Sequence, residues 1–383
     1  MSDGLIRDLT DEEARASLRA KWGMAEEGVI PAWIAEMDYA PADCVTDALV
    51  DAVRQGVLGY PPFETGGQLG EAYAGFAARH FGQHVDPGHV RPVVDVTAGV
   101  RLLLDVLSGP GPMVMPVPAY SPQLEIAQIT GRERVDLFVD PEAERAELDL
   151  DQLDRLLADG AQTLLLTQPH NPWGRVFTRA ELEGVRDVVV RHGARVISDE
   201  IHAPLVLPGA RHVSYLDLEG TADHAVALVA ASKAFNTAGL KCAQLVIPDD
   251  ATRKAIEDVP MARNDSWSSL GIVASIAAYT QGDAWLAALL ERLDQQRTLL
   301  ATLLAEHLPA ARMRPLEATY LAWIDLRAYG HQRPAELAKE RGRVWVYEGD
   351  AFHPGLSGHI RLNIATSPER LTEVVRRLAS ALA

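Results

Sequence analysis

The sequence has little of what marks secreted, membrane-bound or metal-binding proteins. It contains two cysteines among 383 residues, Cys44 and Cys242, and they lie far apart. This spacing excludes a disulfide framework and a cysteine-based metal motif, and it suits a reducing compartment. No apolar run approaches the roughly 20 residues that a membrane span needs, and residues 1–22 lack the apolar core of a secretion signal. We therefore expect a cytoplasmic protein with no membrane contact and no metal site.

Positive charge is also scarce. The chain has 36 Lys and Arg against 53 Asp and Glu, which gives a formal net charge of -17. A chain this acidic is poorly suited to bind nucleic acid through a broad surface, so we expect no nucleic-acid partner. Hydrophobic residues make up 48% and charged residues 23%, as in ordinary globular enzymes. The length exceeds that of a single ordinary core and predicts two domains.

The middle of the chain alternates strand-like and helix-like segments. Expected strands cover residues 91–97, 113–117, 134–139, 163–169, 194–200, 224–232 and 242–248, and expected helices cover 100–108, 149–160 and 178–193. Strands that are apolar on both faces and separated by helices need cover on both sides. The pattern predicts an α/β fold, in which a large domain over residues 46–282 contains a mostly parallel sheet of the seven-stranded type.

The end of the chain has a different pattern. A long amphipathic helix over 283–308 precedes three short strands at 319–326, 343–349 and 359–366 and a last helix over 367–383. We expect a smaller α+β domain here. Residues 1–45 precede the large sheet and have no strand run of their own, so we expect them to pack with residues 283–383.

Polar residues follow the apolar strands of the predicted sheet. Asn171 follows one strand, Asp199 and His202 follow the next, and Lys233 follows a third. In parallel sheets, ligands bind at the carboxyl ends of the strands. A lysine there is a candidate nucleophile if burial lowers its pKa, a carboxylate such as Asp199 can pair with a cationic ring nitrogen, and the Asn171 amide can donate to a phenolate oxygen.

An anion site is indicated next to these groups. "TAGV" (97–100) lies between an expected strand and helix, so the backbone N–H groups of Gly99 and Val100 would face an anion such as phosphate, with Lys241 as a cation for it. Each signal alone has a plainer explanation, such as a helix cap, a turn or a surface lysine. Their joint occurrence predicts one cofactor with an aldehyde, a ring nitrogen, a phenolic oxygen and a phosphate, which is pyridoxal 5'-phosphate (PLP).

Several motifs carry a resemblance to a known family. They are "QPHNPWGRVFT", "VISDEIHAPLVLPG", "ASKAFNTAGLK" and "HIRLNIAT". They resemble the motifs of fold-type-I PLP enzymes of the aminotransferase class I/II superfamily. Within it, "KWGMAEEGVIPAWIAEMDYAP", "DEIHAPL" and "EATYLAWIDLR" are similar to the cystathionine β-lyase-like C–S lyase branch. The resemblance extends from about Lys21 to the end of the chain.

The resemblance implies roles for the cofactor-binding residues. Lys233 would bind the cofactor covalently and move the α-proton of the substrate. Asp199 would keep the ring nitrogen protonated, Asn171 and His202 would lie at the ring oxygen, and Ser232 belongs to the same cofactor-binding motif.

The resemblance also implies contacts with the substrate and with a second subunit. Tyr120 would stack on the cofactor ring and contact the substrate, and Arg361 would bind the substrate carboxylate. Tyr60 would reach the phosphate of the neighbouring subunit's cofactor, which requires a homodimer with active sites at the interface.

The implied activity is PLP-dependent C–S β-lyase cleavage of cystathionine or another S-substituted cysteine to a thiol, pyruvate and ammonia. An aminotransferase, or a related PLP enzyme that acts on a cysteine conjugate in a biosynthetic pathway, would use the same residues. A PLP-binding regulator that contacts other proteins is a third reading.

Two positions depart from the family pattern. Ala230 stands where the family usually has a phosphate-binding serine, and Arg101 stands where a small or apolar residue is usual. One hypothesis is that Arg101 replaces the missing phosphate contact. A solvent-facing helix arginine explains it equally well.

Overall fold

The main body of the protein is a seven-stranded sheet. The computed structural model describes residues 4–62, 66–139, 143–264 and 266–383. The strand order is β2-β8-β7-β6-β5-β3-β4, with bounds β2 Val90–Val93, β3 Met113–Val117, β4 Arg134–Phe138, β5 Thr163–Thr167, β6 Arg195–Asp199, β7 Ala225–Val229 and β8 Ala243–Val246. Strands β7, β6, β5, β3 and β4 are parallel to one another, and β8 is antiparallel to both of its neighbours. The predicted fold class is confirmed.

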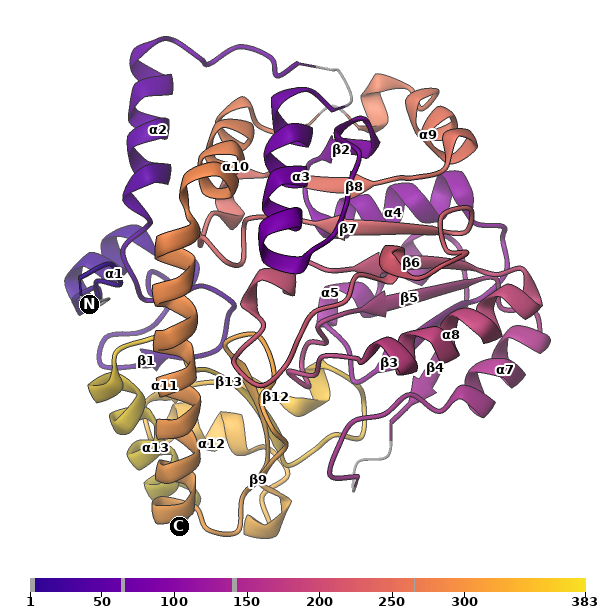
Figure 1. Cartoon of the computed structure of the whole chain (residues 1–383). Coiled ribbons are helices and arrows are strands. Elements are labelled where there is room, and N and C mark those ends of the chain that lie inside the picture. Colours follow the sequence, from indigo (N-terminus) through magenta and orange to yellow (C-terminus); the bar gives the residue numbers. More distant parts are fainter. Residues whose placement is uncertain (1–3, 63–65, 140–142, 265) are drawn as a thin grey trace.

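Helices cover both faces of this sheet, as its apolar strands require (Figure 1). On one face, Leu165 and Ile197 lie in a core with α4 (Val96–Leu107) and α9 (Asp250–Glu257). On the other face, Leu164 and Val196 lie in a core with α7 (Leu150–Ala158) and α8 (Arg179–His192). A third core joins α2 (Asp43–Arg54), α3 (Gly67–Phe81) and α10 (Ser269–Gln281) to β7 and to the C-terminal part of the chain.

The ends of the helices agree with their sequence signals in one case and differ in another. Thr178 and Glu181 form a capping box at the start of α8, and Gly193 ends it with a φ of 61°. The strand expected over 91–97 instead ends at Val93, and α4 begins at Val96 rather than at residue 100. The reason is that the Asp95 side chain accepts a hydrogen bond from the Ala98 N–H and caps the helix early.

The C-terminal part holds a second, smaller sheet beside the long helix α11 (Asp283–His307). Its order is β12-β13-β10-β9, all antiparallel neighbours. The bounds are β9 Arg312–Met313, β10 Leu321–Asp325, β12 Tyr347–Glu348 and β13 His359–Asn363, with helices α12 Pro334–Glu340 and α13 Pro368–Leu382. The strand expected over 343–349 is two short strands, because β11 (Val344–Trp345) pairs elsewhere.

The N-terminal segment joins this smaller unit. Strand β1 (Ile30–Pro31) pairs in parallel with β11, so the segment does contain a short strand, contrary to the sequence expectation. Helix α1 (Asp11–Ser17) lies near α13, where Arg370 donates to Asp11.

Two short helices, α5 (Ser121–Leu124) and α6 (Ile126–Ile129), lie between β3 and β4 in the chain. None of the described helices combines the length and apolar character needed to cross a membrane. The division into domains at residues 45 and 283 stays a prediction.

Candidate active site

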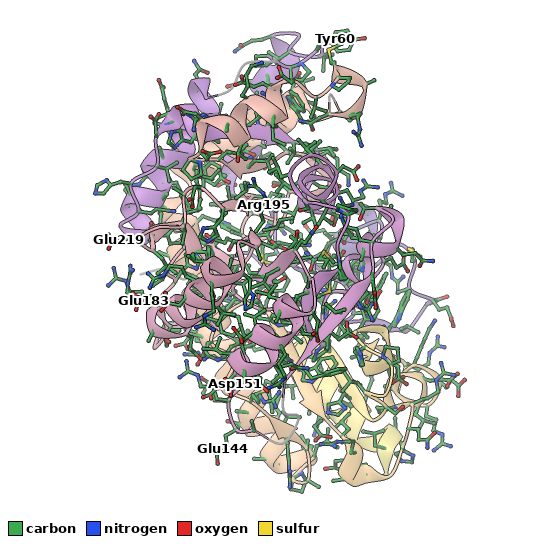
Figure 2. The ribbon with its side chains drawn as sticks, turned by 90° about the vertical axis from the view of Figure 1, so that its right-hand side faces the viewer. Tyr60, Glu144, Asp151, Glu183, Arg195 and Glu219 are labelled. Carbon is green, nitrogen blue, oxygen red and sulfur yellow. The ribbon has the colours of Figure 1, made fainter. Side chains whose placement is uncertain are left out.

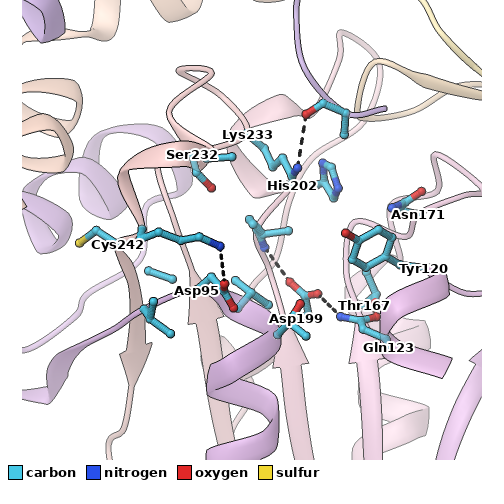
Figure 3. A pocket seen from close by; sticks show the side chains of 18 residues that line it. Asp95, Tyr120, Gln123, Thr167, Asn171, Asp199, His202, Ser232, Lys233 and Cys242 are labelled. Carbon is cyan, nitrogen blue, oxygen red and sulfur yellow. Dashed lines mark hydrogen bonds and ion pairs between the residues drawn. The ribbon is translucent and has the colours of Figure 1, made fainter. Parts of the chain in front are cut away.

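One cavity collects most of the predicted site residues at the carboxyl ends of the parallel strands (Figure 3). The predicted residues on its wall are Tyr120, Asn171, Asp199, His202, Ser232, Lys233 and Lys241. They lie at or after the ends of β3, β5, β6 and β7. The sheet topology therefore brings together side chains separated by more than one hundred residues, at the edge where ligands bind in such folds.

Lys233 lies four residues after the end of β7 and points into the cavity. Its Nζ donates to the backbone oxygen of Ala35 at 3.4 Å. Burial, together with the nearby charge of Arg361, lowers the pKa of Lys233 to about 8. A substantial fraction of this amine is therefore neutral, and thus nucleophilic, near physiological pH.

Asp199 is the last residue of β6 and is buried opposite Lys233. Burial raises the pKa of Asp199 to about 6, while hydrogen bonds from the Ile201 N–H and the Gln123 side chain oppose the rise. The Gln123 Nε2 lies 2.7 Å from the Asp199 Oδ2. The carboxylate is thus mostly ionised at neutral pH and can face a cationic partner in the cavity.

Asn171 and Arg361 form one unit behind the cavity. The Arg361 Nη1 donates to the Asn171 Oδ1 at 3.0 Å, and its Nη2 donates to the Trp33 backbone oxygen at 2.9 Å. This orientation leaves the Asn171 amide N–H₂ as the donor for another group. Arg361 is 2% exposed, and its guanidinium lies over the rings of Tyr347 and Phe352. No described group bonds to its buried Nε, so unused donors remain.

His202 and Tyr120 line the same cavity with different exposure. His202 is buried, and burial lowers its pKa to about 3, so the ring is neutral. No described residue bonds to its Nδ1. Tyr120 precedes α5 and is 36% exposed, with its ring toward the cavity. Tyr60 is 91% exposed, lies at one end of the molecule in Figure 2 and is not among the residues that line this cavity.

The predicted anion site differs in detail from the sequence expectation. Val96 and Thr97, in the first turn of α4, line the cavity, and the N–H groups of such a turn lack acceptors within the helix. Gly99 and Val100 do not line it. A Cβ on Gly99 would come within 2.3 Å of the Leu228 side chain, so this glycine lets α4 pack on β7.

Lys241 faces the start of α4 through an ion pair. Its Nζ lies 2.9 Å from the Asp95 Oδ2. Burial opposes ionisation of Asp95, but the Ala98 N–H and Lys241 together hold the pKa of this carboxyl below its usual range. The two departures lie outside the wall of the cavity: Ala230 is buried in the core beneath α4, and Arg101 is exposed on α4. Whether Arg101 replaces a phosphate contact stays a hypothesis.

Sequence analysis missed a strap formed by residues 33–37. Arg361 donates to Trp33, while Lys233 and Tyr320 donate to the Ala35 oxygen. Asn236 bonds both the N–H and the oxygen of Met37. The strap therefore ties the N-terminal segment to the cavity. The sequence of this strap, within "WIAEMDYA", supported the resemblance to the C–S lyase branch, but it did not indicate that these residues contact the cavity.

The side chains of the cavity match the chemical groups of PLP. Lys233 offers an amine for an aldehyde, Asp199 a carboxylate for a ring nitrogen, and Asn171 an amide donor for a phenolic oxygen. Lys241, Ser232 and the start of α4 offer cationic and neutral donors for a phosphate.

Comparison with known proteins agrees with this geometry. The sequence profile of the aminotransferase class I and II family matches residues 34–378. The chain belongs to this family. It is 36% identical over 373 residues to a cystathionine beta-lyase of Corynebacterium glutamicum, covering 97% of this chain and 98% of the relative. It is 30% identical over 387 residues to the cystathionine beta-lyase PatB of Bacillus subtilis, covering 97% and 98%.

A solved structure has the same fold. A proposed PLP-dependent beta-cystathionase of Corynebacterium diphtheriae superposes with a TM-score of 0.93 at 32% identity, covering 98% of this chain and 99% of the other. The resemblance to the C–S lyase branch that the motifs indicated is confirmed.

Proposed function

We propose that this protein is a PLP-dependent carbon–sulfur β-lyase that releases a thiol, pyruvate and ammonia from cystathionine or another S-substituted cysteine. The observation that carries the proposal is one cavity in which a partly buried amine, Lys233, faces a buried carboxylate, Asp199. The cystathionine beta-lyase relatives and the matching structure bear out the sequence prediction of a PLP-dependent lyase.

The residues of the cavity would each have a separate role in the reaction. PLP, when bound, would supply an electron sink for negative charge at the substrate Cα. Asp199 would hold a proton on the ring nitrogen by its charge, and Asn171 would donate to the ring oxygen from the amide that Arg361 orients. Tyr120 would cover one face of the ring.

Lys233 would act first as the anchor and then as the base. As a free amine with a pKa of about 8, Lys233 would be suited to remove the Cα proton of the substrate near neutral pH. The unused donors of Arg361 would bind the substrate carboxylate. The strap at Ala35 would keep the Lys233 Nζ close to the reacting carbon and shield it from water.

The function is tested by a screen of S-substituted cysteines, with cystathionine first, for pyruvate release without any keto acid. We expect sustained pyruvate and thiol release. A single stoichiometric conversion to the pyridoxamine form, with no pyruvate, would identify an aminotransferase instead. Borohydride reduction followed by mass mapping tests the anchor, because a pyridoxyl mass on any residue other than Lys233 contradicts the assignment.

We further propose that the protein is a homodimer in the cytoplasm. Exposed apolar side chains gather on α2 and the segment after it: Val50, Val53, Val57, Leu58 and Tyr60. A homodimer formed over this surface would cover them, and Tyr60 would then reach the phosphate in the neighbouring subunit. Two free cysteines agree with a cytoplasmic location.

A further inference from the structure

Asp199 has a buried neighbour for which the reaction as described above has no role. Gln123 lies on the short helix α5, three residues after Tyr120, and is 2% exposed. Its Nε2 lies 2.7 Å from the Asp199 Oδ2 (Figure 3). A buried amide that close to a carboxylate makes a strong, charge-assisted hydrogen bond.

A second contact fixes the direction of the amide. The Thr167 Oγ1, at the end of β5, lies 3.4 Å from the Gln123 Oε1 and can donate to it. An ionised carboxylate only accepts hydrogen bonds, so the amide must present its nitrogen to Asp199 and its oxygen to Thr167. The backbone N–H of Gln123 also donates to the backbone carbonyl oxygen of Tyr120, which couples the position of Gln123 to that of the ring-stacking tyrosine.

Few other groups can stabilise the charge of Asp199. The Ile201 N–H donates to the Oδ1 at 3.2 Å, and the charge of Lys233 lowers the pKa of this carboxyl. The adjacent carboxylate of Glu200 acts in the opposite direction. On its other sides Asp199 faces two neutral rings, His202 and Tyr120, and, further away, the carboxylate of Asp95.

We propose that Gln123 is a positioning residue that keeps Asp199 ionised and aims its carboxylate at the ring nitrogen of PLP. This inference rests on the proposed role of Asp199. With PLP attached to it, Lys233 would no longer offer a free ammonium, so Gln123 would be the main side chain of this protein that favours the ionised carboxylate. Without that donor, Asp199 would hold its own proton at higher pH, and as a neutral acid it would no longer stabilise the protonated ring nitrogen by its charge.

The test measures PLP affinity of the apoprotein against pH for the parent and two variants. Gln123→Met keeps the length and volume of the side chain but removes the donor. Gln123→Glu places a second carboxylate beside Asp199. The contribution of ionised Asp199 to affinity is present above its pKa of about 6 and is lost as the pH falls through it, separately from the loss near pH 8 that protonation of Lys233 causes in every variant. We expect the midpoint of this loss to move upward by about one pH unit in Gln123→Met and further in Gln123→Glu.

A direct titration covers variants that bind PLP too weakly to measure. The apoprotein labelled with ¹³C in the aspartate carboxyl groups reports the Asp199 signal, which Asp199→Asn identifies by its disappearance. The same upward shift is expected there. Ser121→Ala is the matched control, because Ser121 lies on the same short helix and no described group bonds to its hydroxyl; its midpoint should equal that of the parent.

The outcomes distinguish the proposed role of Gln123 from the proposed role of Asp199. If Gln123→Met has the parent's midpoint in both measurements, while Asp199→Ala removes the loss of affinity near pH 6, the role of Gln123 is wrong and that of Asp199 stands. If Asp199→Ala binds PLP with the parent's affinity and pH dependence, the proposed role of Asp199 itself fails.

Discussion

Burial and neighbouring charges set the chemistry of the single residues that matter most. Lys233 and Asp199 would both be ordinary surface ions in water, but the cavity shifts their pKa values toward each other, to about 8 and about 6. The type and the strand-end position of both residues could be predicted from sequence. The partner atoms could not, because the Ala35 oxygen that receives Lys233 lies 198 positions away in the chain and Gln123 lies 76 positions from Asp199.

The pKa of Lys233 predicts how the apoprotein captures PLP. Only the neutral amine attacks an aldehyde, so the capture rate should rise about tenfold per pH unit below pH 8 and level off above it. Because the Arg361 charge lowers this pKa, Arg361→Gln should move the levelling point upward, whereas the half-exposed Arg263→Gln should not. Stopped-flow absorbance measures the rate. A rate independent of pH between 6 and 9 would contradict the assignment.

Even the conservative replacement of Arg361 by lysine should strongly impair activity on cystathionine. Arg361→Lys removes the fork that reaches Asn171 and Trp33 at once, so we expect kcat/KM for cystathionine to fall about 100-fold, chiefly through KM. Arg327→Lys, at an exposed position of the same small unit, serves as the control and should change little. Steady-state kinetics checks both, and an unchanged KM in Arg361→Lys would argue against a carboxylate contact.

At the scale of elements, the motifs that resemble the C–S lyase branch contain residues that connect distant segments of the chain. Lys21 and Trp22 both bind the buried Asp38, at 2.8 Å in each case. Glu317 accepts from Arg175 and from the Val176 N–H, which joins two other motifs. The expected helices and strands mostly formed where periodicity placed them. The start of α4 did not, because a cap by Asp95 outweighed the strand-like pattern of residues 94–97.

The Lys21–Asp38 pair gives a test of stability. Asp38→Ala leaves a buried ammonium without its main partner and should cost about 3–5 kcal/mol of unfolding free energy. Lys21→Met leaves Asp38 with Trp22 and Arg370 and should cost clearly less. Urea denaturation of the holoenzyme compares the two variants. Equal midpoints would show that the pair does not act as described.

At the scale of the whole molecule, the sheet and its helices position the cavity, Ala35 of the N-terminal strap lines it, and the small sheet supports its wall through the contact of Arg361 with Asn171. The large sheet was predictable, because its strands are apolar on both faces. The pairing of β1 with β11 was not, since each strand has only two residues and joins segments about 300 positions apart.

The exposed side of α2 gives a prediction about assembly. If a second copy covers it, Val53→Asp should shift the protein toward monomers and weaken PLP binding, because Tyr60 would lose its place at the neighbouring site. Val190→Asp introduces the same charge at a comparably exposed valine on α8 and should leave the mass unchanged. Light scattering measures the mass. Equal behaviour of the two variants would place the interface elsewhere.

The most direct test of the central proposal is a count of products per active site. The holoenzyme is given cystathionine with no keto acid, and pyruvate and free thiol are measured together over time. The lyase chemistry predicts equal amounts of both, continuing far beyond one equivalent per site, and none from Lys233→Ala. Product formation that stops at one equivalent, or thiol release that persists at the parent's rate in Lys233→Ala, would contradict it.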